Sequence, residues 1–332
     1  DKSSRRKMVI FGISGFLLAS ILMPFVANIE QFLALRFGQA FVSSAATVVI
    51  PGTIREYYQK DTAKGLSYVS MIMMVAPMIA PSIGSILLLA HSWQMIFYVL
   101  SLYSLVVLIL VIKYLPEVVQ STAKPDNNIS FLIRYKIVFS NHEARFDIIS
   151  SMMISLAFFA YITAIPFVYL TVFQVSEFNF SILFGITVVA LMSSHFINTR
   201  LVVRKGSRKM LSYGLTCALI ASTILLAANY FSLPLVYTVV SILPLMGGIS
   251  MVAVNSDALV ITKFPENSGT ATAVIGTLRF GIGATAGPIL AYFYDGSAFP
   301  FAVLMFSAVI VVLVCQIIIK HNDTKLKSTR IN

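Results

Sequence analysis

Two arginines lie inside long apolar stretches of the chain, where a charged side chain is rarely found. Arg36 lies about one turn inside the stretch 32–53, and Gln39 follows one helical turn later on the same face. Arg279 lies near the middle of the stretch 268–293. A charge in such surroundings costs several kcal/mol unless it is paired or faces water. We therefore expect Arg36 and Gln39 to line a cavity, and Arg279 to have a partner or an anionic ligand.

Each arginine also has a plainer interpretation. Arg36 is close enough to the end of its stretch for the guanidinium to extend along the apolar surface and reach water. Arg279 is too far from either end to do so easily, but it could donate a structural hydrogen bond to unwound backbone.

Five acidic residues lie near the ends of the apolar stretches, and no acidic residue lies in the middle of such a stretch. They are Glu30, Asp147, Glu177, Asp257 and Asp295. Moving a proton through an apolar layer usually requires a buried carboxylate whose pKa can be raised. Asp257, which lies beside Asn255 close to the end of its stretch, is the nearest candidate. Its position near the end of a span nevertheless favours a solvated residue at the membrane surface.

The elements that carry these residues are predicted to be membrane-spanning helices. Hydrophobic residues make up 58% of the 332 residues, charged residues make up 11%, and the mean hydropathy is +0.88, which excludes a soluble domain. Ten apolar stretches are long enough to cross a bilayer. They are 7–26, 32–53, 66–90, 94–114, 146–172, 178–199, 209–229, 235–256, 268–293 and 299–319. The sequence thus predicts an all-α polytopic membrane protein.

The distribution of positive charge predicts the orientation of these spans. The net charge is +11, yet the basic residues gather in alternate connections, at 1–7, 53–65, 113–145, 200–209, Lys263 and 320–332. The short connections on the other side, such as 91–93 and 230–234, contain no lysine or arginine. This bias places both ends of the chain in the cytoplasm. It also argues against nucleic-acid binding, because the positive charge follows the membrane topology.

Other kinds of chemistry have little support in the sequence. The four histidines are widely separated and show no metal-ligand spacing. The segment Gly281–Gly287 imitates a dinucleotide-binding motif, but it lies within an apolar span and predicts close helix packing instead. A P-loop and a nucleophile elbow are both absent from the sequence. We therefore expect no enzymatic activity, no cofactor and no bound metal. A polytopic membrane enzyme is the alternative from another class, and it would need acidic residues and histidines clustered at one interface.

The stretch 66–90 combines small residues with prolines in a helical pattern. Ala76, Ala80 and Gly84 recur every four residues and would allow another backbone to approach closely. Pro77 and Pro81 lie beside them and each remove a backbone donor, which predicts a bend. We expect a flexing contact between helix bundles. A tightly packed span without motion is the alternative.

A repeat predicts two bundles. Ser4–Met8 recurs as Gly206–Met210, an offset of 202 residues, and each copy opens a new span. The predicted parts are an incomplete first bundle of four spans (1–114), a cytoplasmic linker (115–142), a second bundle of six spans (143–319) and a cytoplasmic tail (320–332). Because two spans precede the second copy within its bundle, symmetry predicts two further spans before the first copy. We therefore expect the chain to be a fragment of a twelve-span protein.

Several motifs together resemble the major facilitator superfamily, and within it the drug:proton antiporters of the bicyclomycin- and chloramphenicol-resistance type. Asp1-Lys2-Ser3-Ser4-Arg5-Arg6-Lys7 is similar to the end of the superfamily's loop between helices two and three, with Ser4 in place of glycine. Leu33-x-x-Arg36-x-x-Gln39-Ala40 is similar to its fourth-helix signature, and Ala76-x-x-x-Ala80-Pro81-x-x-Gly84-Ser85 to its fifth-helix antiporter motif. Phe159-Ala160-Tyr161 and the segment from Gly269 to Gly281 resemble the subfamily. The resemblance covers the whole chain as helices three to twelve.

The resemblance implies a monomeric transporter of the bacterial inner membrane that exports small drug-like compounds in exchange for protons. It implies a substrate and proton pathway of Arg36, Gln39, Arg279, Tyr161, Asn255 and Asp257, and a gating loop of Asp1, Arg5 and Arg6. Arg279 departs from the family pattern, in which a neutral polar residue is more usual. An uptake symporter or facilitator of the same fold is the main alternative.

Overall fold

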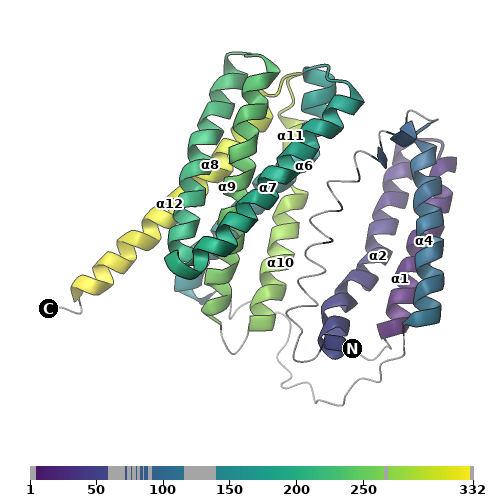
Figure 1. Cartoon of the computed structure of the whole chain (residues 1–332), viewed down its shortest axis with the longest axis horizontal. Coiled ribbons are helices and arrows are strands. Elements are labelled where there is room, and N and C mark those ends of the chain that lie inside the picture. Colours follow the sequence, from purple (N-terminus) through teal and green to yellow (C-terminus); the bar gives the residue numbers. More distant parts are fainter. Residues whose placement is uncertain are drawn as a thin grey trace. The chain divides into compact units, whose positions relative to one another are not determined.

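A computed structural model describes residues 5–58, 92–115, 140–264 and 268–329, together with residues 72, 76, 80, 83, 84 and 86–88. Within these residues the chain is helical and contains no β-strand (Figure 1). It forms two compact units, Asp1–Asp126 and Asn127–Asn332. The prediction of an all-α membrane protein is confirmed by the helical fold and by eight described segments that are long and apolar enough to cross a bilayer.

The first unit is built around a close contact between two helices. It contains α1 (Arg5–Leu22), the short η1 (Met23–Phe25), α2 (Ile29–Tyr58) and α4 (Gln94–Tyr114). A Cβ atom at Gly12 of α1 would lie 2.9 Å from the backbone nitrogen of Ala46 in α2. Only glycine therefore allows the two backbones to approach this closely. α4 packs against α1 as a third helix.

The second unit is organised around α6. It contains α6 (His142–Phe167), η3 (Val168–Val172), α7 (Glu177–Lys205), α8 (Ser207–Tyr230), α9 (Leu235–Thr262), α10 (Ser268–Ala284), α11 (Ala286–Tyr292) and α12 (Phe299–Thr329). α6 packs against α9, α10 and α12, while α8 packs against α9 and α12 (Figure 1). Apolar residues of α6, α9 and α10 form a buried cluster that includes Ile148, Val260 and Ile275. This arrangement brings the polar residues of four helices close to α6.

Two predicted spans are irregular in the structure, and proline explains both departures. Pro166 lacks the N–H that would bond to the carbonyl of Ile162, and a wide π-turn follows it, with the Phe173 amide donating to the Val168 carbonyl at 3.0 Å. The predicted span 268–293 is divided into α10 and α11 at Thr285. Pro288 cannot donate to the carbonyl of Ala284, so the helical ladder is interrupted there.

The 202-residue repeat extends to individual contacts. α1, α2 and α4 in the first unit correspond to α8, α9 and α12 in the second. Gly214 of α8, the counterpart of Gly12, lies against Gly248 of α9, the counterpart of Ala46. In both units a glycine of the first helix permits the same close approach to the second. The repeat is therefore matched by this packing contact, and the division of the chain into two bundles stays a prediction.

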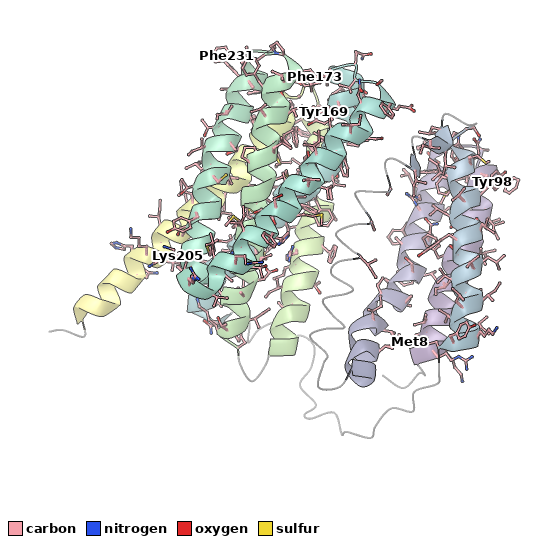
Figure 2. All side chains as sticks on the ribbon, in the orientation of Figure 1. Met8, Tyr98, Tyr169, Phe173, Lys205 and Phe231 are labelled. Carbon is pink, nitrogen blue, oxygen red and sulfur yellow. The ribbon has the colours of Figure 1, made fainter. Side chains whose placement is uncertain are left out.

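Basic residues of the second unit gather at one end of its helices. Lys205 ends α7, Arg208 lies in the first turn of α8, and Lys263 follows α9. Figure 2 shows Lys205 at one end of this unit and Phe231, which follows α8, at the other. This is the end that the charge distribution predicts to face the cytoplasm.

Candidate functional site

The candidate site begins where α10 approaches α6 most closely. A Cβ atom at Gly283 would lie 2.3 Å from the ring of Phe159 in α6, so glycine is needed for this approach. The expected packing role of the Gly281–Gly287 segment is therefore confirmed at Gly283. At Gly281, by contrast, no described atom lies within 4 Å of an added Cβ. Because Arg279 lies one turn before Gly283, the close approach brings its side chain to α6 and α9.

Arg279 and Asp257 form an ion pair between α10 and α9. Nη1 of Arg279 lies 2.5 Å from Oδ2 of Asp257, and Nε donates to the hydroxyl of Ser155 at 2.7 Å. The other carboxylate oxygen of Asp257 accepts a hydrogen bond from Ser151 at 2.5 Å. The side chains of Arg279 and Asp257 are 34% and 23% exposed, respectively. The pair is therefore partly accessible from a cavity rather than sealed within the core.

The ion pair lines a cavity of about 180 Å³ between α6, α7, α9 and α10. His195 of α7 and Ser250 of α9 line the same cavity and are joined by a contact of 2.8 Å between the ring Nε2 and the hydroxyl. The remaining walls are mostly apolar and include Phe158. The cavity thus combines an apolar lining with an acid, a base and a permanent cation, which is the composition of a small-molecule or proton site.

Polar contacts hold α7 against α9 on either side of His195. The hydroxyl of Ser194 donates to the carbonyl of Gly247 at 2.6 Å. The amide of Asn255 donates to Asn198 at 2.7 Å. Interhelical hydrogen bonds of this kind stabilise helix association in a membrane. They fix the wall of the cavity that carries His195.

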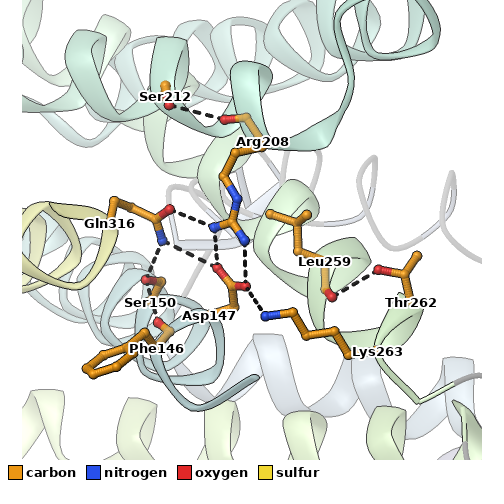
Figure 3. A network of polar contacts seen from close by, with 9 residues as sticks. All are labelled: Phe146, Asp147, Ser150, Arg208, Ser212, Leu259, Thr262, Lys263 and Gln316. Carbon is orange, nitrogen blue, oxygen red and sulfur yellow. Dashed lines mark hydrogen bonds and ion pairs between the residues drawn. The ribbon is translucent and has the colours of Figure 1, made fainter. Parts of the chain in front are cut away.

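A second polar cluster surrounds Asp147, whose side chain is completely buried (Figure 3). Nη1 and Nη2 of Arg208 bond to its two carboxylate oxygens at 2.7 and 2.9 Å, and Nζ of Lys263 lies at 3.2 Å. Arg208 also donates to Gln316, which in turn donates to Ser150. The cluster joins α6, α8, α12 and the end of α9. Because the carboxylate of Asp147 is fully buried and the bonds of the cluster connect four elements, the cluster is best explained as a structural junction.

Comparison with known proteins shows the family. The model of the Major Facilitator Superfamily matches residues 1–288. This chain belongs to the major facilitator superfamily. The bicyclomycin resistance protein homologue of Haemophilus influenzae is 25% identical over 331 residues, covering 98% of this chain and 82% of the relative. The uncharacterised MFS-type transporter YdgK of Bacillus subtilis is 29% identical over 315 residues, covering 94% of this chain and 78% of the relative.

A solved structure shows the same fold. The bacterial homologue of the human lysosomal transporter Spinster, in an inward-facing and unoccupied conformation, matches with a TM-score of 0.70. The alignment is 12% identical and covers 96% of this chain and 83% of the other. The predicted resemblance to a drug-resistance type of the superfamily is confirmed, and the chain is a transporter of the membrane.

The pairing of Arg279 in this transporter confirms one expectation and corrects another. The partner expected for Arg279 is present and is Asp257. The interpretation of Asp257 as a solvated surface residue is wrong, because its carboxylate accepts bonds from Arg279 and Ser151 and is less than one quarter exposed. Sequence reasoning also passed over Asp147 and His195, since the first was placed at a span end and the second was grouped with scattered histidines.

Arg36 and Gln39 lie together in the first unit of the transporter. Nη1 of Arg36 donates to the side-chain carbonyl of Gln39 at 2.8 Å, and Gln39, which is buried, donates to Ser20 of α1 at 2.8 Å. The guanidinium lies 5.5 Å from the ring centre of Phe97. Arg36 lines a cavity of about 600 Å³ together with Trp93 and Phe97. The predicted shared face of Arg36 and Gln39 is thus present, and their role in a transport pathway stays a prediction.

Other predicted site residues lie apart from the ion pair. Tyr161 is buried and stacks on Phe184 of α7, with ring centres 6.0 Å apart. Asn255 faces Asn198 on α7. Neither residue lines the cavity that contains Asp257.

Much of the predicted gating and flexing machinery falls outside the described residues. Asp1, Pro77 and Pro81 are not described, and of Arg5 only the backbone is described, at the start of α1. Arg6 donates to the carbonyl of Ile112 in α4 at 2.6 Å. Ala76 and Ala80 are helical and exposed, and Gly84 is helical and half-buried. The roles of all these residues stay predictions.

Substituting alanine for Gly283 tests the packing that positions Arg279. We expect Gly283→Ala to destabilise the purified transporter by about 1–3 kcal/mol, because the new methyl group would overlap the ring of Phe159. Gly281→Ala is the matched control in the same helix, and it should be neutral or stabilising by up to about 1 kcal/mol, since alanine favours helix. Thermal unfolding in detergent measures both. Equal stability of the two variants would contradict the proposed contact.

Proposed function

We propose that this transporter exports small amphiphilic compounds from the cell in exchange for protons. The observation that carries the proposal is the Arg279–Asp257 ion pair, which lines a cavity within the membrane-spanning helices. Its relatives support the substrate class, since one that aligns with 98% of the chain is named a bicyclomycin resistance protein homologue. The proposed location is the bacterial inner membrane, with both ends of the chain in the cytoplasm, as the basic residues indicate.

Asp257 has the surroundings that a proton carrier needs. While the carboxylate is charged, Arg279 and Ser151 satisfy it and hold α10 and α6 to α9. Protonation cancels the attraction between Asp257 and Arg279, so the two helices are no longer joined by opposite charges. A compound entering the apolar part of the cavity would meet either the neutral pair or a protonated acid beside a free cation. These two states differ in charge and can therefore favour different conformations.

Asp295 provides a useful contrast, because it lies in the connection between α11 and α12. Hydrogen bonds from the hydroxyl and amide of Ser297 hold the pKa of Asp295 below its usual range. Asp295 therefore stays ionised at neutral pH and cannot carry protons there. Asp257, by contrast, lies on α9 and lines the same cavity as Arg279.

Drug accumulation tests the proposed function. The chain is produced in a host lacking its own efflux pumps, and cells are loaded with bicyclomycin with and without a proton uncoupler. We expect several-fold lower accumulation in producing cells than in cells with an empty vector, and loss of that difference on adding the uncoupler. Accumulation that rises above the empty-vector level would indicate uptake instead and contradict export. Export that resists the uncoupler would contradict coupling to protons.

A further inference from the structure

The cavity that contains the ion pair also holds a third titratable or charged side chain. The titratable or charged residues that line the cavity are Asp257 from α9, Arg279 from α10 and His195 from α7. The polar residue that α6 contributes is the neutral Ser155. Asp257 and Arg279 bind each other. His195 is half-buried, and its contact with Ser250 is the one hydrogen bond that its ring makes among the described residues. One ring nitrogen thus remains able to gain or lose a proton.

The contact with Ser250 suits both charge states of the imidazole. A serine hydroxyl can donate to the Nε2 lone pair of the neutral ring, or accept from Nε2–H of the protonated ring. Ser250 therefore keeps its bond when the ring gains a proton. A histidine bound to a permanent donor such as lysine would lose that bond on protonation. The geometry allows His195 to titrate without separating α7 from α9.

Joining α7 to α9 does not require the chemistry of a histidine. Ser194 and Asn198 already bond to α9 on either side of His195. Glutamine at position 195 could form the same bond to Ser250 with its side-chain amide. What histidine adds over such a residue is a charge that can change within the physiological pH range.

We propose that His195 is a second proton-binding residue of this cavity and that its charge is coupled to those of Asp257 and Arg279. With the ion pair intact and the imidazole neutral, the cavity has no net charge. A proton on His195 is attracted by Asp257 and repelled by Arg279, so the histidine and the acid titrate as a linked system. The inference rests on the proposed function where it assigns the second proton to the exchange of protons for the exported compound. The linked titration itself depends only on the geometry of the cavity.

Nuclear magnetic resonance of the intact chain in lipid nanodiscs tests the linkage directly. With labelled histidine, the chain gives four ring signals, and His195→Gln assigns the one of interest. We expect the titration midpoint of His195 to move by about 1 pH unit in Asp257→Asn and in Arg279→Gln, in opposite directions. The double variant should return close to the native midpoint, which also shows that the site still folds. Ser193→Ala, at an exposed position of α7 whose hydroxyl donates to the Val189 carbonyl of the same helix, is the matched control and should leave the midpoint unchanged.

Transport by His195→Gln supplies a second measurement, because glutamine keeps the bond to Ser250 but cannot carry the proton. The number of protons exchanged for each bicyclomycin, measured in inverted vesicles, should fall by one. A midpoint that stays the same in all variants overturns the proposal, even if export remains sensitive to the uncoupler. Opposite shifts combined with uncoupler-resistant export support the linked site and overturn the proposed function instead.

Discussion

Replacing Asp257 by asparagine is expected to reduce proton-coupled export by about 100-fold or more. The amide keeps the shape of the side chain but cannot hold the charge that Arg279 requires at 2.5 Å. Because the pair is partly accessible, water screens the unpaired charge, and most of the loss is expected from removal of the proposed proton carrier. Removing a group that transfers a proton typically lowers a rate by about 10²-fold or more. Uncoupler-sensitive drug efflux from cells, corrected for the amount of protein in the membrane, measures the loss.

Three further variants separate the proton from the ion pair. Arg279→Gln should impair export while leaving Asp257 able to bind a proton. The double variant Asp257→Asn/Arg279→Gln should recover stability, because no unpaired charge remains, yet it should not recover coupled export. Asp295→Asn replaces an exposed acid outside the spans and is expected to export normally. Normal, uncoupler-sensitive export by Asp257→Asn would remove this residue from the proton pathway.

The largest effect on stability is expected from Arg208→Ala. This change leaves the completely buried carboxylate of Asp147 with Lys263 as its remaining cation (Figure 3). Loss of a partner from a buried pair costs about 3–5 kcal/mol, and here the carboxylate is bonded through both oxygens. We expect the detergent-solubilised protein to unfold at a clearly lower temperature. Lys209→Ala, at the exposed neighbouring position, is the control and should change little.

A combined substitution tests whether the cost comes from the stranded charge. Asp147→Leu with Arg208→Met removes both charges and fills similar volume, so it should regain most of the lost stability. If the double variant is as unstable as Arg208→Ala, the cluster stabilises the fold by some means other than charge pairing.

The sequence predicted the helical membrane fold well, because apolar length is a strong signal. The predicted spans 209–229 and 235–256, for example, lie within the bounds of α8 and α9, respectively. The sequence predicted that Arg279 has a partner or an anionic ligand, but it did not predict which residue or which residue type. Which acid lies opposite an arginine depends on how three helices cross, and the close approach at Gly283 that sets this crossing is a tertiary feature.

Two residues were missed although a pattern marked them. Asp147, Ser150, Ser151 and Ser155 follow helical spacing along one face of α6, which is a polar stripe within an apolar span. Ser194, His195 and Asn198 form a similar group on α7. Asp147 was judged by its distance from the end of its span, and this overlooked the polar stripe. Neighbouring helices decide whether a residue near a helix end is buried, and the sequence alone does not place them. Looking for metal-ligand spacing among all four histidines likewise hid the local setting of His195.

The duplicated contact at Gly12 and Gly214 has a consequence for how cargo preference can change in this protein. Each glycine allows the same close contact between the two helices of its pair. Three polar positions of the two helix pairs also match at the 202-residue offset. They are Ser20, Arg36 and Gln39 in the first unit, and Ser222, Thr238 and Ser241 in the second. In the first unit these positions form a chain of hydrogen bonds that ends in a cation. In the second unit they are small hydroxyl residues, and all three are buried. The two units thus share the glycine contact between their helices, but they differ in the polar side chains at the three matching positions. Exchanging residues between the two sets would alter the polarity of one bundle without changing the glycine contact on which its packing depends.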